Sequence, residues 1–259
     1  MRYADFHVHT RFCDGANTVR EMVESAIEKG LSAIGFSAHS YTFFDESYCM
    51  KKEQTEQYKA EVLACKEEYR DKIRVLLGIE QDLYSDMPTD GYDYVIGSVH
   101  YLKKDGAYYS VDSSAEGFQK MAEKVFGGDF YALCEAYFDA VSKIAAVIHP
   151  TFIGHFDLVC KFNEKYRFFD ETHLRYVAAW KKALDALLLA GIPFEVNTGA
   201  ISRGYKTVPY PSRAQLQYIK EKGGKVILSG DTHACNSLCF DFPKWERELL
   251  ALHIPMITL

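Results

Sequence analysis

Short apolar runs alternate with longer amphipathic stretches along the chain. The short runs are rich in branched and aromatic side chains, as strands are, whereas the longer stretches repeat their apolar positions at helical spacing. We predict strands at residues 3–9, 31–37, 73–79, 94–99, 152–155, 193–197, 225–230 and 255–259. We predict helices at residues 18–30, 51–69, 114–147, 171–190, 212–222 and 243–252.

Local signals support several of these boundaries. Thr18 and Glu21 have the spacing of a capping box, and Gly127-Gly128 is expected to break the helical stretch 114–147 in two. The alternation amounts to about seven βα units, which predicts a parallel sheet. Closure into a barrel, with residues 1–259 as a single α/β domain, is the favoured architecture. An open doubly wound sheet is the alternative, but no glycine-rich nucleotide-binding motif follows any predicted strand.

Composition narrows the class of protein. The 259 residues are 48% hydrophobic and 25% charged, with a formal net charge of −6, so a globular chain is expected and non-specific binding to nucleic acid is not. Arg2 and Asp5 occupy positions where a signal peptide needs apolar residues, and no apolar run is long enough to span a bilayer. Seven cysteines without a CxxC pair suit reduced thiols. We therefore expect a cytoplasmic protein with no membrane partner.

The histidines are not spread at random. Six of the nine lie at or just beyond the carboxyl end of a predicted strand, at positions 7, 9, 39, 100, 155 and 233. Acidic residues share this location at Asp14, Glu80, Glu195 and Asp231. The carboxyl ends of barrel strands meet on one face, where active sites are built. A single histidine there is more often structural, but this many at equivalent positions indicates a metal site.

The spacing within two short segments strengthens this interpretation. His7 and His9, and likewise Asp231 and His233, are two residues apart at a strand end, so both members of each pair face the same way. Imidazole and carboxylate together suit Zn²⁺, Mn²⁺ or Fe²⁺. One tetrahedral ion cannot use so many ligands. We therefore predict two to three divalent ions, and such a cluster is suited to phosphate ester hydrolysis.

The same residues carry a family resemblance. The strings HVHT at 7–10, SAHS at 37–40, GIEQD at 78–82, GSVH at 97–100, GHFD at 154–157 and GDTH at 230–233 resemble, in order, the motifs of the polymerase-and-histidinol-phosphatase (PHP) family. Together with EVNTG at 195–199, they are most similar to monofunctional histidinol-phosphatases.

The resemblance implies a distorted (βα)7 TIM-like barrel, the PHP fold, with a trinuclear metal centre. It implies a metal-dependent phosphomonoesterase that hydrolyses L-histidinol phosphate, in histidine biosynthesis, through a metal-bridging hydroxide. It also implies three ligand sets: His7, His9, Glu80 and Asp231 for one ion; Glu80, His100 and His155 for a second; Asp14, His39 and His233 for the third. Some family members have His at the position of Asp14, which leaves the identity of the third metal open.

Other residues are expected to act on the substrate. Arg203 and Lys161 reach the predicted active face and suit a phosphate, with surface charge as the alternative for each. Glu195 and Asn197 are expected either to bind the amine and imidazole of the substrate or to hold their loop. The predicted catalytic residues are Arg203, Asp231 and His233.

Two alternatives remain at this point. The same scaffold could act on another small phosphate ester, a nucleotide or a phosphotyrosine. A non-catalytic metal-binding module is less well supported, because all nine ligand positions hold ligand-type residues. Cys13 and Cys235 lie near predicted ligands, but a free cysteine is more often a small buried apolar residue than a nucleophile. The partner is expected to be a small phosphate ester, and the oligomeric state stays open.

Overall fold

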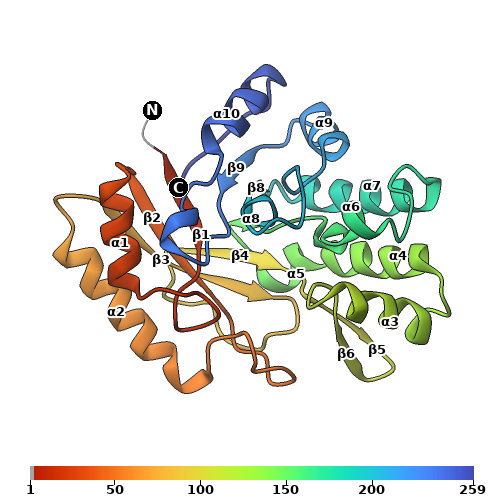
Figure 1. Ribbon diagram of the computed structural model, residues 1–259, viewed down its shortest axis with the longest axis horizontal. Helices are drawn as coiled ribbons and strands as arrows, with labels where there is room; N and C mark the ends of the chain where they lie inside the picture. The colour runs from red at the N-terminus through yellow and green to blue at the C-terminus, as the bar shows by residue number, and fades with distance from the viewer. Residues whose placement is uncertain (1–2) are drawn as a thin grey trace.

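A sheet of seven parallel strands forms the centre of the computed structural model, which describes residues 3–259 (Figure 1). In spatial order the strands are β1 (Ala4–Val8), β2 (Ala33–His39), β3 (Arg74–Asp82), β4 (Tyr94–Ser98), β7 (Phe152–Ile153), β8 (Phe194–Asn197) and β9 (Val226–Ser229). Each strand pairs in parallel with the next one in this order.

The first strand also meets the segment that follows the last strand. Val8 and Thr232 form a parallel bridge, in which the Thr232 amide donates to the His7 carbonyl at 2.8 Å. The His9 amide donates to the Thr232 carbonyl at 2.8 Å. These bonds make the sheet a nearly closed barrel, so the predicted α/β barrel is confirmed.

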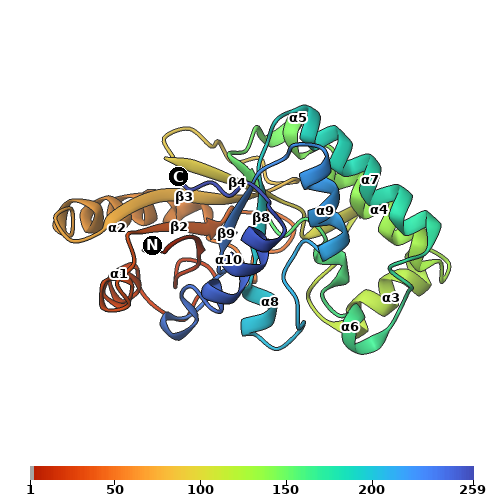
Figure 2. The ribbon, with the colours of Figure 1, turned by 90° about the horizontal axis from the view of Figure 1, so that it is seen from above.

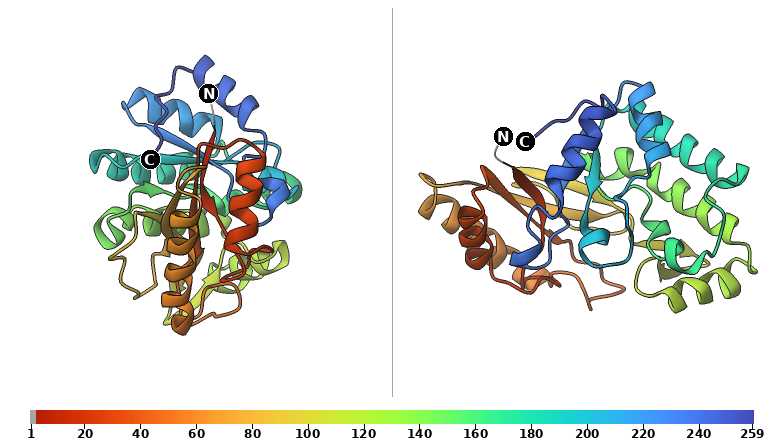
Figure 3. Two further views of the ribbon diagram at one scale, coloured as in Figure 1. Left: turned by 90° about the vertical axis from the view of Figure 1, so that its left-hand side faces the viewer. Right: turned by 45° about the horizontal axis from the view of Figure 1, so that its top comes forward.

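Helices surround the barrel unevenly. Helices α1 and α2 cover the sheet beside β1–β3, whereas α3, α4, α6 and α7 gather at the other end of the molecule (Figures 1 and 2). Helix α10 packs beside β9 (Figure 3). The helices are α1 (Val19–Glu28), α2 (Thr55–Glu68), α3 (Ala115–Val125), α4 (Phe130–Val141), α5 (Ile144–Ile148), α6 (Asn163–Tyr166), α7 (Leu174–Leu189), α8 (Gly199–Ser202), α9 (Arg213–Glu221) and α10 (Phe242–Ala251).

The local signals act as expected. The Thr18 side chain accepts a hydrogen bond from the Glu21 amide, and the Glu21 side chain accepts one from the Thr18 amide, which completes the capping box of α1. Gly127 and Gly128 adopt positive φ of 62° and 84°, which separates α3 from α4. Both predicted boundaries are confirmed.

The structure differs from the prediction in several elements, among them the short helices α6 and α8, which were not predicted. The antiparallel hairpin β5 (Tyr101–Lys104) and β6 (Ala107–Ser110) was not predicted, although Asp105-Gly106 between them is a hairpin signal and both residues have positive φ. The predicted strand at 255–259 is wrong. Only one isolated bridge, between Val226 and Met256, joins this segment to β9, because the pairing is limited to the hydrogen bonds that the Val226 amide and carbonyl make with Pro255 and Ile257.

Tyr94 packs across the strands that carry the metal-ligand candidates. Its hydroxyl donates to the carbonyls of Phe6 and Phe36 at 2.8 and 3.0 Å. Its ring fills the space beside Gly78, where an added Cβ would approach the ring atoms to 2.3 Å. Gly78 is therefore required for close approach, and the buried ring ties β1, β2 and β3 together.

Within residues 3–259 no helix is both long and apolar enough to cross a membrane.

Candidate metal centre

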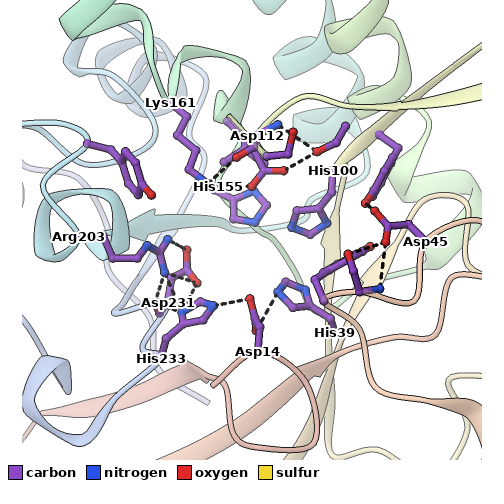
Figure 4. A pocket seen from close by; sticks show the side chains of 17 residues that line it. Asp14, His39, Asp45, His100, Asp112, His155, Lys161, Arg203, Asp231 and His233 are labelled. Atoms are coloured by element: carbon purple, nitrogen blue, oxygen red, sulfur yellow. Dashed lines mark hydrogen bonds and ion pairs between the residues drawn. The ribbon is translucent and has the colours of Figure 1, made fainter. Parts of the chain in front are cut away.

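Six strands bring the nine predicted metal ligands to one end of the barrel. The strand positions are fixed by buried, apolar neighbours in the sheet, so the polar residues at the strand ends have little freedom to move apart. The nine come from β1 or the loop after it (His7, His9, Asp14), the end of β2 (His39), β3 (Glu80), and the segments after β4 (His100), β7 (His155) and β9 (Asp231, His233). Figure 4 shows six of them around one pocket.

Glu80 lies at the centre of this group. Its Oε2 atom is 3.2 Å from His7 Nε2, 3.6 Å from His9 Nε2 and 2.8 Å from His39 Nδ1. Its Oε1 atom is 2.9 Å from the Nε2 of His155 and 3.4 Å from that of His100. One carboxylate thus faces five imidazoles from both of its oxygens, which is the arrangement expected of a ligand shared between ions.

Several buried atoms in this group have no hydrogen-bond partner among the described residues. They are His7 Nε2, His9 Nε2, Glu80 Oε2 and His155 Nδ1. Buried polar atoms are normally satisfied, and leaving four of them unpaired in one place is costly unless something binds there. Since three of these atoms, on His7, His9 and Glu80, also converge on one point, a cation fits the site.

Three groups of ligand atoms are close enough to hold an ion. Within each group the atoms lie within 4.8 Å of one another. The groups are His9, Asp14, His39 and His233; His7, His9 and Glu80; and His39, Glu80 and His100.

This grouping is close to the three sets that the resemblance implies, with His9 and His39 each shared between two groups. Asp231 Oδ1 lies 3.4 Å from His9 Nε2 and 3.8 Å from His7 Nε2, beside the second group. His155 contacts Glu80, beside the third. All nine residues are therefore brought together, while their division among ions stays a prediction.

The charges in the group keep Glu80 ionised, while its carboxylates raise the pKa of His7, His39 and His100 above the usual value against the effect of burial. Burial opposes ionisation of Glu80, but the surrounding histidines outweigh it and hold the pKa of Glu80 well below its usual value. Burial, together with the charges of His233 and His39, lowers the pKa of His9 to about 3, so its ring is neutral and can offer a lone pair. The group therefore supplies ionised carboxylates and at least one neutral imidazole.

Two buried acids orient the imidazoles from behind. Glu195 Oε1 lies 2.5 Å from His7 Nδ1, and Asp82 Oδ2 lies 3.3 Å from His100 Nδ1. A proton held at Nδ1 by the acid leaves Nε2 of each ring free to face Glu80. The structure therefore makes Glu195 and Asp82 positioning residues for the imidazoles.

The position of Glu195 and Asn197 decides between the two roles expected for them. Both side chains are fully buried and neither lines the pocket. Asn197 donates to Glu195 Oε2 at 2.9 Å and accepts from the Gly199 amide at 2.8 Å. Their burial and these hydrogen bonds support the second role, in which they hold the β8 loop and the imidazoles in place.

Arg203 and Lys161 do line the pocket (Figure 4). Arg203, with its side chain 29% exposed, donates from Nη2 to Asp231 Oδ2 at 2.9 Å and from Nη1 to the Asp231 carbonyl at 3.0 Å. Lys161 Nζ forms an ion pair with Asp112 Oδ2 at 3.0 Å. Both cations are at the expected face, and each is already partly neutralised by an aspartate.

Sequence reasoning missed the acids on the wall of the pocket. Asp45 and Asp112 line it, together with Tyr48, and none of these follows a strand of the barrel directly. We refer to Asp45, Asp112, Lys161 and Arg203 as the rim. The only signal available for Asp45 was its loop position between β2 and α2.

Cys13 does not act as a nucleophile in this structure. Its Sγ lies 3.5 Å from His9 Nδ1 and does not line the pocket. Burial and the neighbouring Asp14 raise the pKa of the Cys13 thiol to about 12, so it is protonated at neutral pH. All seven cysteines, which lie within residues 3–259, are free thiols.

Comparisons with known proteins agree with the geometry. A family model described as the PHP domain matches residues 5–199. The chain is 27% identical over 265 residues to a histidinol-phosphatase of Bacillus subtilis, covering 93% of this chain and 97% of that one. It is 29% identical over 265 residues to a probable histidinol-phosphatase of Deinococcus radiodurans, covering 95% of this chain and 92% of that one.

A solved structure has the same fold. The crystal structure of histidinol phosphate phosphatase from Lactococcus lactis, complexed with Zn, L-histidinol and phosphate, superposes with a TM-score of 0.76 at 20% identity. The match covers 99% of this chain and 95% of that one. At this level of identity the likeness shows the fold.

Proposed function

The chain belongs to the PHP-domain family, and from this premise we propose that it is a metal-dependent histidinol-phosphatase. It hydrolyses the monoester L-histidinol phosphate to L-histidinol and phosphate, a step of histidine biosynthesis. Full-length similarity to curated histidinol-phosphatases supports this substrate. The observation that carries the proposal is the convergence of five imidazoles on both oxygens of Glu80, at the base of a pocket that two cations line.

The donor set fits two to three divalent ions. Imidazole with carboxylate favours Zn²⁺, Mn²⁺ or Fe²⁺ over Mg²⁺ and Ca²⁺. His7, His9, Glu80 and Asp231 would hold one ion, with Glu80 shared with a second. The remaining ligands would be His100 and His155 for the second ion, and Asp14, His39 and His233 for the third. When bound, such ions neutralise phosphate oxygens and lower the pKa of a coordinated water.

The residues around the metal ligands act by holding those ligands in fixed positions. Arg203 fixes Asp231 through its carbonyl and one carboxylate oxygen, so the carboxylate presents a constant face to the pocket. His233 Nδ1 accepts a hydrogen bond from Arg203 Nη1 at 2.7 Å, and its Nε2 faces Asp14 Oδ2 at 3.2 Å. Arg203, Asp231 and His233 thus form one connected unit at the reacting end of the pocket, which supports their assignment as catalytic residues.

The phosphate is bound between this unit and Lys161. A guanidinium retains donors beyond the two that contact Asp231, and these are available to a phosphate oxygen. Lys161, which also lines the pocket, adds a point charge. Because negative charge builds on the transferring group, both contacts become stronger in the transition state than in the bound ester.

A phosphatase assay of the purified, metal-loaded protein tests the proposal. The panel contains L-histidinol phosphate, a nucleoside monophosphate, phosphotyrosine and p-nitrophenyl phosphate. We expect kcat/KM to be highest for L-histidinol phosphate by at least about tenfold. Equal turnover of the panel would contradict the substrate assignment and leave a general phosphomonoesterase. No turnover of any ester by the loaded protein would contradict the enzymatic function altogether.

A further inference from the structure

The pocket is electrically polarised. Figure 4 shows Arg203 and Lys161 on one side of the metal-binding side chains and Asp45 on the opposite side. A phosphate ester that places its phosphoryl group against the cations must direct its leaving alcohol elsewhere in the pocket. The wall that holds Asp45 is available to that alcohol.

Asp45 is held in a fixed orientation. Its Oδ1 accepts from the Ser47 amide at 2.9 Å and from the Ser47 hydroxyl at 2.6 Å. Its Oδ2 accepts from the Tyr101 hydroxyl at 2.5 Å. A carboxylate has about four acceptor positions, so three are used and one on Oδ2 remains. These bonds outweigh the effect of burial and hold the pKa of Asp45 below its usual value.

The charge of Asp45 is not compensated, unlike that of its neighbours. Asp231 is paired with Arg203 at 2.9 Å and Asp112 with Lys161 at 3.0 Å. Burial opposes ionisation of Asp112, but Lys161 lowers the pKa of that carboxyl to about 2. Among residues 3–259 no ion pair involves Asp45, and its hydrogen-bond donors are all neutral. A fixed, ionised carboxylate without a cationic partner therefore lines the pocket.

Aromatic rings hold the loop of Asp45 against the β5–β6 hairpin. Phe44 stacks on Tyr108 with ring centroids 3.8 Å apart and planes 4° apart, and it also meets Tyr101 edge-on at 4.9 Å. Tyr48 lies between Tyr101 and His39, at 5.8 and 4.9 Å from their ring centroids. The wall therefore runs from Asp45 over Tyr48 to the metal centre, and aromatic faces together with a carboxylate suit a nitrogen cation.

We propose that Asp45 is a specificity-determining residue that binds the positively charged nitrogen of the leaving alcohol, with Tyr48 as the adjoining wall. This inference rests on the proposed function, since it assumes that the pocket holds a phosphate ester. It gives Asp45 the role of binding the cation, which was one of the two roles expected for Glu195 and Asn197. In L-histidinol phosphate the cation is either the ammonium group or the protonated imidazole, and the chemistry that Asp45 recognises is common to both.

The test compares two variants of the same loop. Asp45→Asn removes the charge and keeps an oxygen that accepts from Ser47. Glu46→Gln is the matched control, because Glu46 is the next residue, bonds the Tyr41 hydroxyl at 2.8 Å and does not line the pocket. For each protein kcat/KM is measured with L-histidinol phosphate, with phosphoethanolamine and with p-nitrophenyl phosphate, whose leaving group carries no cation. Thermal unfolding shows whether each variant is folded.

We expect Asp45→Asn to lower the ratio of kcat/KM for L-histidinol phosphate to that for p-nitrophenyl phosphate by about 10- to 100-fold. Glu46→Gln should leave this ratio within about twofold of the wild type. A fall in the phosphoethanolamine ratio as well would support the proposal with the ammonium group as the partner. An unchanged phosphoethanolamine ratio beside a lowered histidinol phosphate ratio would support it with the imidazolium.

A second measurement does not depend on turnover. The inhibition constant of L-histidinol should rise by a similar factor in Asp45→Asn, while that of inorganic phosphate should not. Equal losses with all three esters, or an unchanged ratio, would overturn the proposal even if the wild type is a histidinol-phosphatase. If the wild type does not hydrolyse L-histidinol phosphate, the proposed function fails. The role of Asp45 is then judged by phosphoethanolamine against p-nitrophenyl phosphate.

Discussion

The metal centre and the rim are parts of one pocket with different construction. The metal centre is built from strand ends, and Glu80, His7 and His9 are almost wholly buried within it. The rim is built from loops and from segments outside the barrel strands, and its side chains are partly exposed. In the centre, carboxylates face imidazoles that can bind an ion together with them. In the rim, Asp112 pairs with a cation and Asp45 accepts from neutral donors.

This difference separates two functions. Side chains on strands hold fixed positions at little entropic cost, which suits the demanding geometry of metal coordination. Side chains on loops are easier to change without disturbing the barrel, which suits the recognition of a particular ester. Changes in the centre should therefore affect every substrate alike, and changes in the rim should affect some substrates more than others.

Removal of the metals should have the largest effect. Exhaustive chelation should reduce activity on all esters to background, and Mn²⁺ or Zn²⁺ should restore it, because no other electrophile of comparable strength lies at the base of the pocket. Activity assays and elemental analysis before and after chelation measure this, and two to three ions per chain are expected. A chelated protein with full activity would contradict the metal centre.

Glu80→Gln should have the next largest effect. The amide loses the charge that faces five imidazoles, so metal content and activity should both fall, activity by at least about 100-fold. The loss should be similar for all esters if the centre is common to them. Glu123→Gln, an exposed position on α3, serves as the control and should change neither. Near-normal activity and metal content in Glu80→Gln would exclude a bridging role.

Most of the metal centre was predictable because two simple features of the fold determine it: the alternation of side chains along a strand and the convergence of parallel strand ends. Alternation along a strand places His7 and His9 on one side, and their ring centroids are 5.0 Å apart. Parallel strands bring their carboxyl ends together, so residues as distant as His9 and His233 stack at 4.2 Å. The family resemblance contributed the expected division of the ligands among the ions, which these two features alone do not determine.

The rim could not be predicted in the same way. Lys161 and Arg203 were found from their charge and their place after a motif, but their partners Asp112 and Asp231 depend on how loops fold back. Asp45 is held at the pocket by Ser47 in its own loop and by Tyr101 on an unpredicted hairpin. The two roles of Glu195 stayed open because sequence shows that an acid ends a strand, but not how deeply its side chain is buried.

Arg203→Ala should lower kcat and kcat/KM by about 30- to 1,000-fold, equivalent to about 2–4 kcal/mol. Arg203→Lys should recover little, because an ammonium lacks the fixed planar pair of donors with which a guanidinium matches two phosphate oxygens. The number of ions bound at saturating metal should not change, which separates loss of phosphate binding from loss of a ligand. The exposed Arg213→Ala is the control. Wild-type kinetics in Arg203→Ala would assign the phosphate to another residue.

Asp82→Asn tests a residue that acts through a ligand. Asp82 Oδ2 accepts from the His100 amide at 3.0 Å and faces His100 Nδ1 at 3.3 Å. Without the negative charge His100 is a weaker and less well oriented ligand, so metal affinity and activity should each fall by about tenfold. Metal titration measures the first, and excess metal should restore activity. A loss that excess metal does not correct would contradict a positioning role, and Asp90→Asn on an exposed loop is the control.

Lys161→Ala should have the smallest effect, since its ammonium is already shared with Asp112. Removing it weakens binding of the phosphoryl group but leaves Arg203 in place, so KM should rise by about 3- to 10-fold with a smaller change in kcat. Lys165→Ala, four residues further along on α6, removes the same charge outside the pocket and should change neither.

The double variant Lys161→Ala/Asp112→Asn separates the two functions of Lys161. If the lysine acts chiefly by neutralising Asp112, KM of the double variant should return most of the way to the wild-type value. A direct phosphate contact predicts that KM stays raised. We expect no recovery, because Lys161 lines the pocket and a free ammonium donor can reach a phosphate oxygen while Asp112 holds the other two.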